Sequence, residues 1–405
     1  ETDRDRQRQT ETDRQADMSS KRRRLIGCIA VVLATVAIVD GASASNSRAP
    51  YEQNKLPVED WWSTSWGKLV RSVDVANPTS YTGRTFRKRF RLPFQLYKYL
   101  VDACRQHRVF GGEFSATGKP AMPVELKVLG ALRTLGRATL HDDVAEISGA
   151  DAETHRKAFI LFIRFVSSHF REEWIREPEG EELEQVVREF QMMGFPGAVG
   201  SMDATHVHWR RCPSGATNMH TGKEGFPTRV FNVAVTHHGK VFAVSDSQPG
   251  ARNDKTIVRF DTFVNKMRFD GLYKDLEFIL HDKEGTPHVH RGGYLISDNG
   301  YHHWKLFTCP FKVHSQEEAL RWSRWLESVR KDVECFFGRL KVRFMSLYNP
   351  IYLKYEGDID ALMITCYILH NMLLQWDGLD ISYQDPSSWK PMDGDDDVED
   401  DEPSG

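Results

Sequence analysis

The sequence predicts an α/β fold, in which a mixed sheet flanked by helices follows an all-helical region. Apolar residues recur at helical spacing in residues 123–170, whereas from Ala198 onward they occur in short runs typical of strands. The chain has 405 residues, of which 40% are hydrophobic and 11% aromatic. This is enough apolar material for a sizeable core, and the length predicts two domains.

Three helices are expected in the helical region, at residues 124–135, 142–148 and 151–170. Gly136 and Gly149 end the first two, and Asp151 is expected to cap the third. A helix, a short helix, a turn and a longer helix are typical of a helix-turn-helix, but also of ordinary three-helix packing. In the DNA-reading interpretation, Arg156 and Lys157 lie near the start of the third helix and contact DNA.

Strand signals dominate the next region. Strands are expected at residues 198–210, 228–236, 240–245 and 293–298, with a hairpin turn at 237–239. Asn253 or Asp254 is expected to cap a helix that runs to about residue 266, and a capping box of Ser315 and Glu318 begins another. Three strands, a helix, a strand and further helices follow the order of an RNase H-like fold.

The last of these helices has a clear apolar stripe. The stripe residues are Trp322, Trp325, Leu326, Val329, Val333, Phe336 and Leu340. Glu334 lies off the stripe, with Arg330 one turn before it and Lys341 two turns after it. An exposed ladder of ion pairs explains this pattern as well as a functional site does.

Two further acids favour the functional interpretation. Asp203 lies within the first strand, and Asp298 ends the strand at 293–298. Burying a carboxylate in a strand is costly unless it has a partner or a metal. Together with Glu334, these aspartates form a set of hard oxygen ligands suited to Mg²⁺ or Mn²⁺, and two such ions can act on a phosphodiester.

Six segments resemble successive sequence blocks of the PIF/Harbinger-type DDE superfamily transposases. They are GSMDATHV (200–207), GKEGFPTRVFNV (222–233), PGARNDKT (249–256), ISDNGY (296–301), VECFFGRLKVRF (333–344) and LHN (369–371). The blocks follow the family order, and the resemblance covers about residues 86–372. The 35 residues between Asp298 and Glu334 fit the family's close spacing of its last two acids. One departure is Asn299, where a small residue more often follows the aspartate.

The resemblance implies a metal-dependent endonuclease that cuts and joins DNA phosphodiesters of a transposable element. Asp203, Asp298 and Glu334 would be catalytic and would hold two divalent ions. The partners implied are DNA, at the element ends and at the target, and a separate Myb-like DNA-binding protein; a homo-oligomer is a further possibility. A different class of function, a domesticated DNA-binding or scaffold protein that keeps the fold without transposition, stays open.

Other residues are candidates for secondary roles. The basic residues expected to contact DNA phosphates are Arg330, Lys341, Arg210, Arg211, Lys223 and Arg229, together with the basic residues of 84–91. Asp254 belongs to a family block, but a helix cap explains it equally. His302 and His303 follow Asp298 closely and are candidates for contact with metal or phosphate. His206 and His208 alternate along the first strand and are expected to be surface or core residues.

The two ends of the chain differ in composition from the rest. Residues 1–17 repeat Glu-Thr-Asp-Arg, and eight of the ten residues 393–402 are acidic, so both ends are expected to be disordered. Since the whole chain has a net charge of −3, the part outside the acidic tail is basic. The tail is expected to be solvated or to compete with DNA for that basic surface.

Localisation signals conflict. Residues 18–44 combine Lys21 and three following arginines, an apolar run and small residues, which is the pattern of a secretory signal. A DNA-cutting enzyme is expected in the nucleus, and six cysteines without zinc-ligand spacing indicate a reducing compartment. The segment is a real signal, a nuclear signal beside an apolar run, or an artefact of the reading frame. A real signal would make the chain a secreted nuclease; no stable membrane association is expected in the mature chain.

The predicted organisation has five parts. They are a signal-like, low-complexity segment at 1–50, an aromatic arm and basic helix at 51–122, a helix-turn-helix-like domain at 123–190, an RNase H-like catalytic domain at 191–380, and an acidic tail at 381–405.

Overall fold

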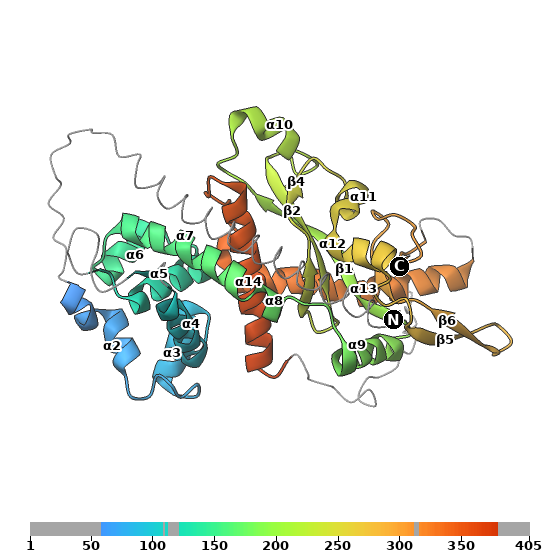
Figure 1. Cartoon of the computed structure of the whole chain (residues 1–405), viewed down its shortest axis with the longest axis horizontal. Helices are drawn as coiled ribbons and strands as arrows, with labels where there is room; N and C mark the ends of the chain where they lie inside the picture. The colour runs from blue at the N-terminus through green and yellow to red at the C-terminus, as the bar shows by residue number, and fades with distance from the viewer. Residues whose placement is uncertain (1–57, 108–109, 112–120, 312–315, 380–405) are drawn as a thin grey trace, which may run out of the picture. The chain divides into compact units, whose positions relative to one another are not determined.

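The computed structural model describes residues 58–107, 110–111, 121–311 and 316–379 (Figure 1). The signal-like segment, the N-terminal repeat, the acidic tail and Ser315 lie outside the described residues. Within the described ranges, no helix combines the length and the apolar content that crossing a membrane requires. Five cysteines in these ranges are free thiols.

Short and long helices precede the sheet. They are η1 (Val58–Ser63), α2 (Ser65–Arg71), α3 (Tyr81–Phe90), α4 (Phe94–Gln106), α5 (Val124–Arg137), α6 (His141–Ser148), α7 (Ala152–His169), α8 (Arg171–Trp174) and α9 (Gly180–Met192). The boundaries of α5, α6 and α7 agree with the prediction to within two residues. Gly149 adopts the left-handed conformation that ends α6, and the Asp151 carboxylate accepts the Thr154 N–H at the start of α7.

A six-stranded mixed sheet follows. Its strands are β1 (Ala198–His208), β2 (Thr228–Val235), β3 (Val241–Val244), β4 (Gln248–Pro249), β7 (Tyr294–Ile296) and β8 (Phe307–Thr308). The order is β3-β2-β1-β7-β8, with β4 paired to β2. β1 is antiparallel to β2 and parallel to β7, so the predicted hairpin and the mixed character of the sheet are confirmed. This sheet, flanked by helices, is compatible with an RNase H-like fold.

The remaining elements lie around the sheet. They are η3 (Ser214–Ala216), α10 (Thr217–His220), α11 (Asp254–Ile257), η4 (Val258–Phe260), α12 (Thr262–Asn265), η5 (Lys266–Asp270), the separate hairpin β5 (Glu277–His281) and β6 (Pro287–Arg291), α13 (Glu317–Arg343), η6 (Met345–Leu347) and α14 (Glu356–Trp376).

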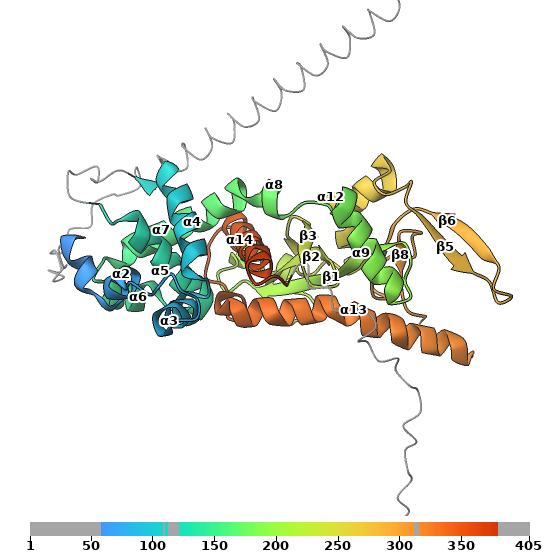
Figure 2. The same ribbon diagram turned by 90° about the horizontal axis from the view of Figure 1, so that it is seen from below.

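The sheet is covered on both faces. Phe231, Val233 and Val235 of β2 belong to the same apolar cluster as Val333 of α13 and residues of α14, whereas the intervening Ala234 belongs to a second cluster near α12. This alternation follows from the two-residue period of a strand. Figure 2 shows α13 along one side of the sheet and α12 on the other. Asp203 pairs with Val233 across β1 and β2, on the sheet face that α13 covers.

The helical region and the sheet region belong to one compact unit. The larger apolar cluster contains buried residues from α3, α4, α5 and α7 as well as from α13 and α14. Arg164 of α7 donates to Asp358 of α14 (2.6 Å), and the Thr365 hydroxyl of α14 donates to the Ile163 carbonyl (2.9 Å). The helix-turn-helix-like domain at 123–190 therefore stays a prediction.

Two predicted helices differ in detail. The single helix expected from Asn253 to about residue 266 is instead α11, η4, α12 and η5, because Asp261 is buried, accepts the Val264 N–H and starts a new helix. The Asn253 side chain is the cap of α11, which leaves Asp254 as its first residue. Gln316 occupies the N-cap position of α13, whereas the predicted cap, Ser315, lies outside the described residues. Trp325 of the predicted stripe is 41% exposed.

Candidate functional site

Two of the three predicted acids are held by their own backbone. Asp203 lies in the middle of β1, and its Oδ1 accepts the Ala204 N–H (2.8 Å). Asp298 lies two residues after β7, and its Oδ1 accepts the Gly300 N–H (2.8 Å) in an Asx turn. Ser201 of β1 pairs with Ile296 of the parallel strand β7, and Asp203 and Asp298 each follow their paired residue by two positions.

Arg330 joins the third acid to the first. Its guanidinium donates to Asp203 Oδ2 (3.2 Å) and to Glu334 Oε1 (2.6 Å). The Arg330 side chain is 15% exposed, and its Nε is buried without a hydrogen-bond partner among the described residues. The arginine expected to contact DNA phosphate is thus the counter-ion of two carboxylates that lie 131 residues apart in the chain.

The electrostatics of Asp203 reflect this crowding. Burial raises the pKa of Asp203 to about 6, and the charges of Asp298 and Glu334 act in the same direction. The Ala204 N–H and the Arg330 guanidinium oppose the rise in pKa. For Arg330, burial lowers the pKa, but the charges of Asp203, Glu334 and Asp298 outweigh it and hold the pKa above its usual value. Asp298 and Glu334 therefore both lie within electrostatic reach of Asp203.

Asp254 lies beside Asp298. A Cβ placed on Gly300 would be 2.7 Å from Asp254 Oδ2 and 3.0 Å from Asp298 Oδ1, so only glycine leaves both carboxylates their place. Burial raises the pKa of Asp254, and the negative charge of Asp298 adds to this effect. Because Asn253 caps α11, the carboxylate of Asp254 is not needed for that purpose and belongs to the acidic site.

A buried chain of hydrogen bonds lies next to the acids. The Tyr301 hydroxyl donates to Asn232 Oδ1 (2.5 Å), and the Asn232 amide donates to Asp261 Oδ2 (2.7 Å). Tyr301 and Asn232 are almost completely buried. Burial and the surrounding aspartates, including Asp203 and Asp298, raise the pKa of Tyr301 well above its usual value. These hydrogen bonds hold the turn after Asp298 against β2, an interior strand of the sheet.

A second buried contact fixes α13 to β1. The Ser201 hydroxyl donates to Asp332 Oδ2 (3.0 Å), and His237 Nδ1 lies 3.5 Å from the same oxygen. Ser201 is two residues before Asp203, and Asp332 is two residues before Glu334. This contact therefore fixes the position of α13, and with it Glu334, relative to Asp203 on β1. The sequence interpretation missed it, although an aspartate next to Val333 on the buried side of a helix was a usable signal.

The basic residues expected to bind DNA differ in exposure, and most of them are exposed. The exposed ones are Arg210, Arg211, Lys223, Arg156 and Lys157. Burial lowers the pKa of His206, and the charges of Lys223 and Lys341 add to this effect; Lys223 also opposes the raised pKa of Asp254. Lys223 therefore lies near Asp254, and both lysines lie near His206.

Arg229 departs from that expectation. It is 5% exposed, and it donates to Ser247 and pairs with Glu356 (2.9 Å). A buried arginine with these partners stabilises the fold and is not available to DNA. Arg156 is exposed but pairs with Glu153 (2.7 Å) within α7. His155 beside it is 2% exposed and bonded to Ser148 (2.7 Å), so it is a core residue of the helical region.

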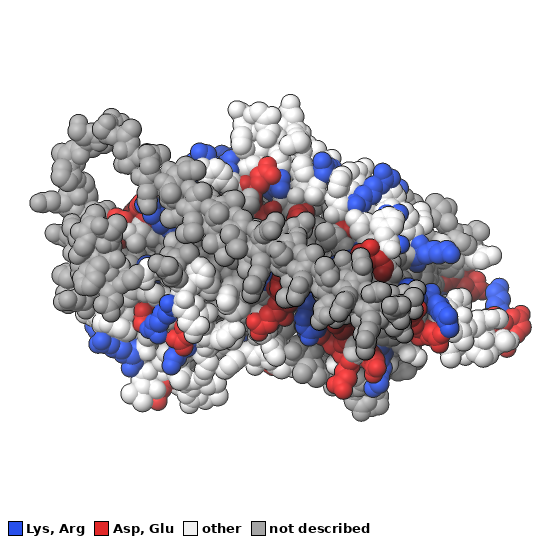
Figure 3. Space-filling view, in the orientation of Figure 1, with Lys and Arg blue, Asp and Glu red and all other residues white. Residues whose placement is uncertain are grey.

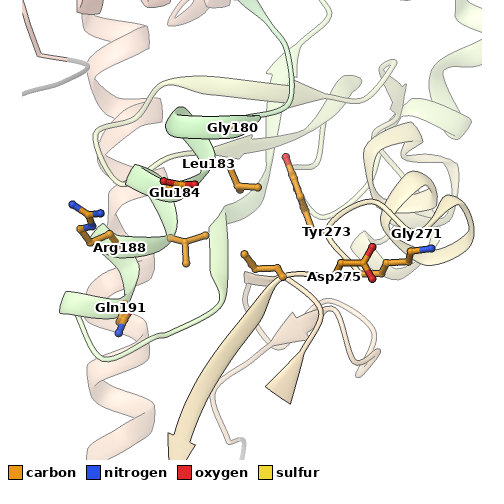
Figure 4. A pocket seen from close by; sticks show the side chains of 11 residues that line it. Gly180, Leu183, Glu184, Arg188, Gln191, Gly271, Tyr273 and Asp275 are labelled. Carbon is orange, nitrogen blue, oxygen red and sulfur yellow. The ribbon is translucent and has the colours of Figure 1, made fainter. Parts of the chain in front are cut away.

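His302 and His303 lie near the site without pointing to a metal role. His302 Nε2 lies 3.1 Å from Arg259 Nε and 3.0 Å from the Lys255 carbonyl oxygen, and its ring stacks on Trp304 at 4.5 Å. His303 is exposed. A pocket lies elsewhere, between α9 and residues 271–276; its lining includes Glu184, Arg188 and Tyr273 but none of the three acids (Figure 4).

The donor set fits a hard divalent cation in chemistry but is not preassembled. Asp203, Asp298, Glu334 and Asp254 supply carboxylate oxygens from four elements, which are the ligands that Mg²⁺ and Mn²⁺ prefer. Among the described residues, no three Asp, Glu, His or Cys side chains form a group ready to hold a metal ion. Arg330 lies between Asp203 and Glu334 instead. A cation held by both Asp203 and Glu334 would require Arg330 to move.

Comparison with known protein families gives a match that includes the candidate site. A family model described as plant transposon protein matches residues 172–380, which are just over half of the chain and contain β1, β7 and α13. The chain belongs to the plant transposon protein family. Searches of curated proteins and of solved structures gave no match. The protein is therefore transposon-derived, and a transposase-like function is the one that its family suggests.

Proposed function

We propose that this plant transposon protein is a DDE endonuclease of the PIF/Harbinger type, which cuts and joins DNA phosphodiesters. One observation carries the proposal: the Arg330 guanidinium donates to Asp203 and to Glu334, and the charge of Asp298 after β7 also acts on it. Concentrating negative charge in this way is costly for the fold. The cost is understandable if the acids have a cation to bind.

Asp203, Asp298 and Glu334 would hold the divalent ions, with Asp254 beside Asp298 as a further carboxylate. When bound, such ions supply a positive charge that activates a water or a 3′-hydroxyl and stabilises the leaving oxygen of the phosphodiester. The protein's own contribution is to hold these side chains in place. The Ser201–Asp332 contact and the Tyr301–Asn232 hydrogen bond do so from two sides.

Arg330, Lys223 and Lys341 would bind the DNA phosphates next to the acids. Arg330 has a second role in this scheme, because it neutralises Asp203 and Glu334 before the cation and DNA arrive. When it leaves the carboxylates, its planar guanidinium can bind a phosphate through two parallel hydrogen bonds. Lys341 is half-buried, and burial lowers its pKa, so it is placed close to the protein surface rather than extended into solvent.

A second candidate function is favoured by the same contact. A domesticated DNA-binding protein that no longer cuts would keep the fold, and Arg330 would then be a permanent partner of the acids. The two functions differ in one measurement. Full-length protein should nick supercoiled plasmid in Mg²⁺ or Mn²⁺ and lose this activity with a chelator, and the Asp298→Ala variant should be inactive. No nicking by folded protein in Mn²⁺, or equal nicking by the variant, would exclude the endonuclease.

A further inference from the structure

Four arginines form a cluster on the helical region, far from the acidic site in sequence. The arginine cluster consists of Arg89 in α3, Arg91 directly after α3, and Arg133 and Arg137 in α5. Arg91 Nε donates to the Gly136 carbonyl (3.3 Å), and Arg133 Nη1 donates to the Arg89 carbonyl (3.3 Å). The Arg91 side chain lies directly over Gly136, where a Cβ would be 2.5 Å from its Cγ.

The arginine cluster has no acidic counterpart among the described residues. None of its four members forms an ion pair there, although neighbouring arginines do: Arg87 pairs with Asp377 (2.6 Å) and Arg105 with Asp102 (3.0 Å). Arg133 Nε is buried and has no hydrogen-bond partner in the part of the chain that the structure describes. Four positive charges held together without an anion repel one another, and partial burial strengthens the repulsion.

The electrostatic consequences are visible in the arginines themselves. Burial lowers the pKa of Arg133, and the charges of Arg137, Arg89 and Arg91 lower it further. Burial and Arg137 lower the pKa of Arg91. The four guanidinium groups are therefore close enough to interact, which is the arrangement required to bind an anion with several charges.

The arginine cluster is connected to the helix that carries Glu334. Helix α5 packs against η6, which follows the end of α13 at Arg343. Burial lowers the pKa of Arg343, and the charges of Arg87 and Arg339 lower it further while Asp377 opposes them, so α3 lies close to the last turns of α13. The rise of a helix places Arg343 about 14 Å along α13 from Glu334. Figure 2 shows this end of α13 beside α3 and α5, and Figure 3 shows basic side chains on the end of the molecule that carries α2 to α4.

We propose that the arginine cluster binds backbone phosphates of duplex DNA that flanks the cut. The identity of the anion rests on the proposed function, whereas the site itself rests on the contacts above. Guanidinium groups match phosphate oxygens in geometry, and a duplex brings several phosphates to one surface at fixed spacing. Contacts of this kind position the DNA without reading its sequence. In this arrangement the acidic site acts on the phosphodiester, and the arginine cluster holds the duplex beyond the end of α13.

The test is DNA binding by the full chain with Arg133→Gln and Arg137→Gln combined. Binding of a fluorescent 40-base-pair duplex (an arbitrary length of about four helical turns) is measured without divalent metal over a series of salt concentrations. Loss of two phosphate contacts should reduce the slope of log affinity against log salt by about two. The matched control is Arg105→Gln, which removes a charge that is already paired with Asp102 on α4 and with Glu125 on α5.

The control should bind DNA like the unmodified chain. If the double variant also keeps the affinity and the salt slope of the unmodified chain, the inference is wrong. Should the double variant fail to fold, Arg137→Gln alone decides, because the Arg137 side chain is exposed; the slope should then fall by about one.

Failure of this inference differs from failure of the proposed function. A chain that nicks plasmid, but whose cluster variants bind DNA unchanged, retains the endonuclease and loses the arginine cluster as a DNA site. A chain that never nicks, but whose cluster variants lose affinity, retains the DNA site and loses the endonuclease.

Discussion

Among the described residues, the acidic site and the arginine cluster are two places where charge of one sign is concentrated. At the acidic site, Arg330 compensates Asp203 and Glu334 from within the chain. In the arginine cluster, no acid among the described residues compensates Arg133 or its neighbours. The difference shows two ways of preparing a binding site. One holds an internal counter-ion that must be exchanged, and the other leaves its charge for an external counter-ion.

The largest effect is expected from Glu334→Gln, which removes one of the two carboxylates that Arg330 compensates at the acidic site. Removing this carboxylate removes a candidate metal ligand, and cleavage should fall by at least about a thousandfold, since metal-ion catalysis is worth several kcal/mol. DNA affinity without metal should be equal or higher, because a negative charge facing phosphate is lost. Plasmid nicking and duplex binding measured on the same preparation check both. Retained cleavage would remove Glu334 from the active site.

A smaller effect is expected from Arg330→Gln, which removes the internal counter-ion. Metal-free protein should lose about 1–2 kcal/mol of unfolding free energy, because Asp203 and Glu334 then face each other without a cation. The value is below that of a fully buried pair, since the Glu334 side chain is 48% exposed. Mg²⁺ or Mn²⁺ should raise the melting temperature more in the variant than in the unmodified chain. An equal rise in both would show that Arg330 does not compete with the metal.

The pH dependence of stability should distinguish the acidic site from the arginine cluster, because carboxylates titrate at pH values at which the protein can be studied and arginines do not. The pKa of Asp203 is about 6 in the folded protein and near its ordinary value of about 3.9 when unfolded. Between these values the folded state binds more protons, so the unfolding free energy should fall as pH rises from about 4 to 6. The loss should reach about 2 kcal/mol and should be absent in Asp203→Asn. Denaturant unfolding with a chelator present at pH 4.5, 5.5 and 6.5 (roughly spanning the window) measures it; identical profiles for both chains would contradict the prediction.

Local signals explain which parts of the fold were predictable. The end of α6 and the start of α7 were predicted because Gly149 and Asp151 determine the backbone at those two points by themselves. The break at Asp261 was not, because it depends on a hydrogen bond between Asp261 and Asn232 in the centre of the sheet. The period of apolar residues in 253–266 contains no trace of that contact.

The candidate site shows the same division. Motifs and spacing selected Asp203, Asp298 and Glu334 as candidate site residues, and they placed Arg330 one turn from Glu334 on the same helix. That Arg330 also reaches Asp203 depends on how α13 crosses β1, which sequence spacing does not specify. The burial of Arg229 was missed for the same reason, since its partner Glu356 lies on α14, more than a hundred residues away.

The smallest expected effect comes from Arg133→Gln, and its sign is what makes it informative. Replacing a charge that is repelled by Arg89, Arg91 and Arg137 should raise the unfolding free energy by less than about 1 kcal/mol, because part of the gain is offset by weakening the bond to the Arg89 carbonyl. Arg105→Gln should have the opposite sign, because Arg105 is paired with Asp102. Both effects should shrink in about 1 M salt, where exposed charges are screened. Chemical unfolding of both variants at low and high salt measures the four values. A destabilising Arg133→Gln at low salt would mean that this guanidinium is compensated inside the chain, and the contrast with the acidic site would then disappear.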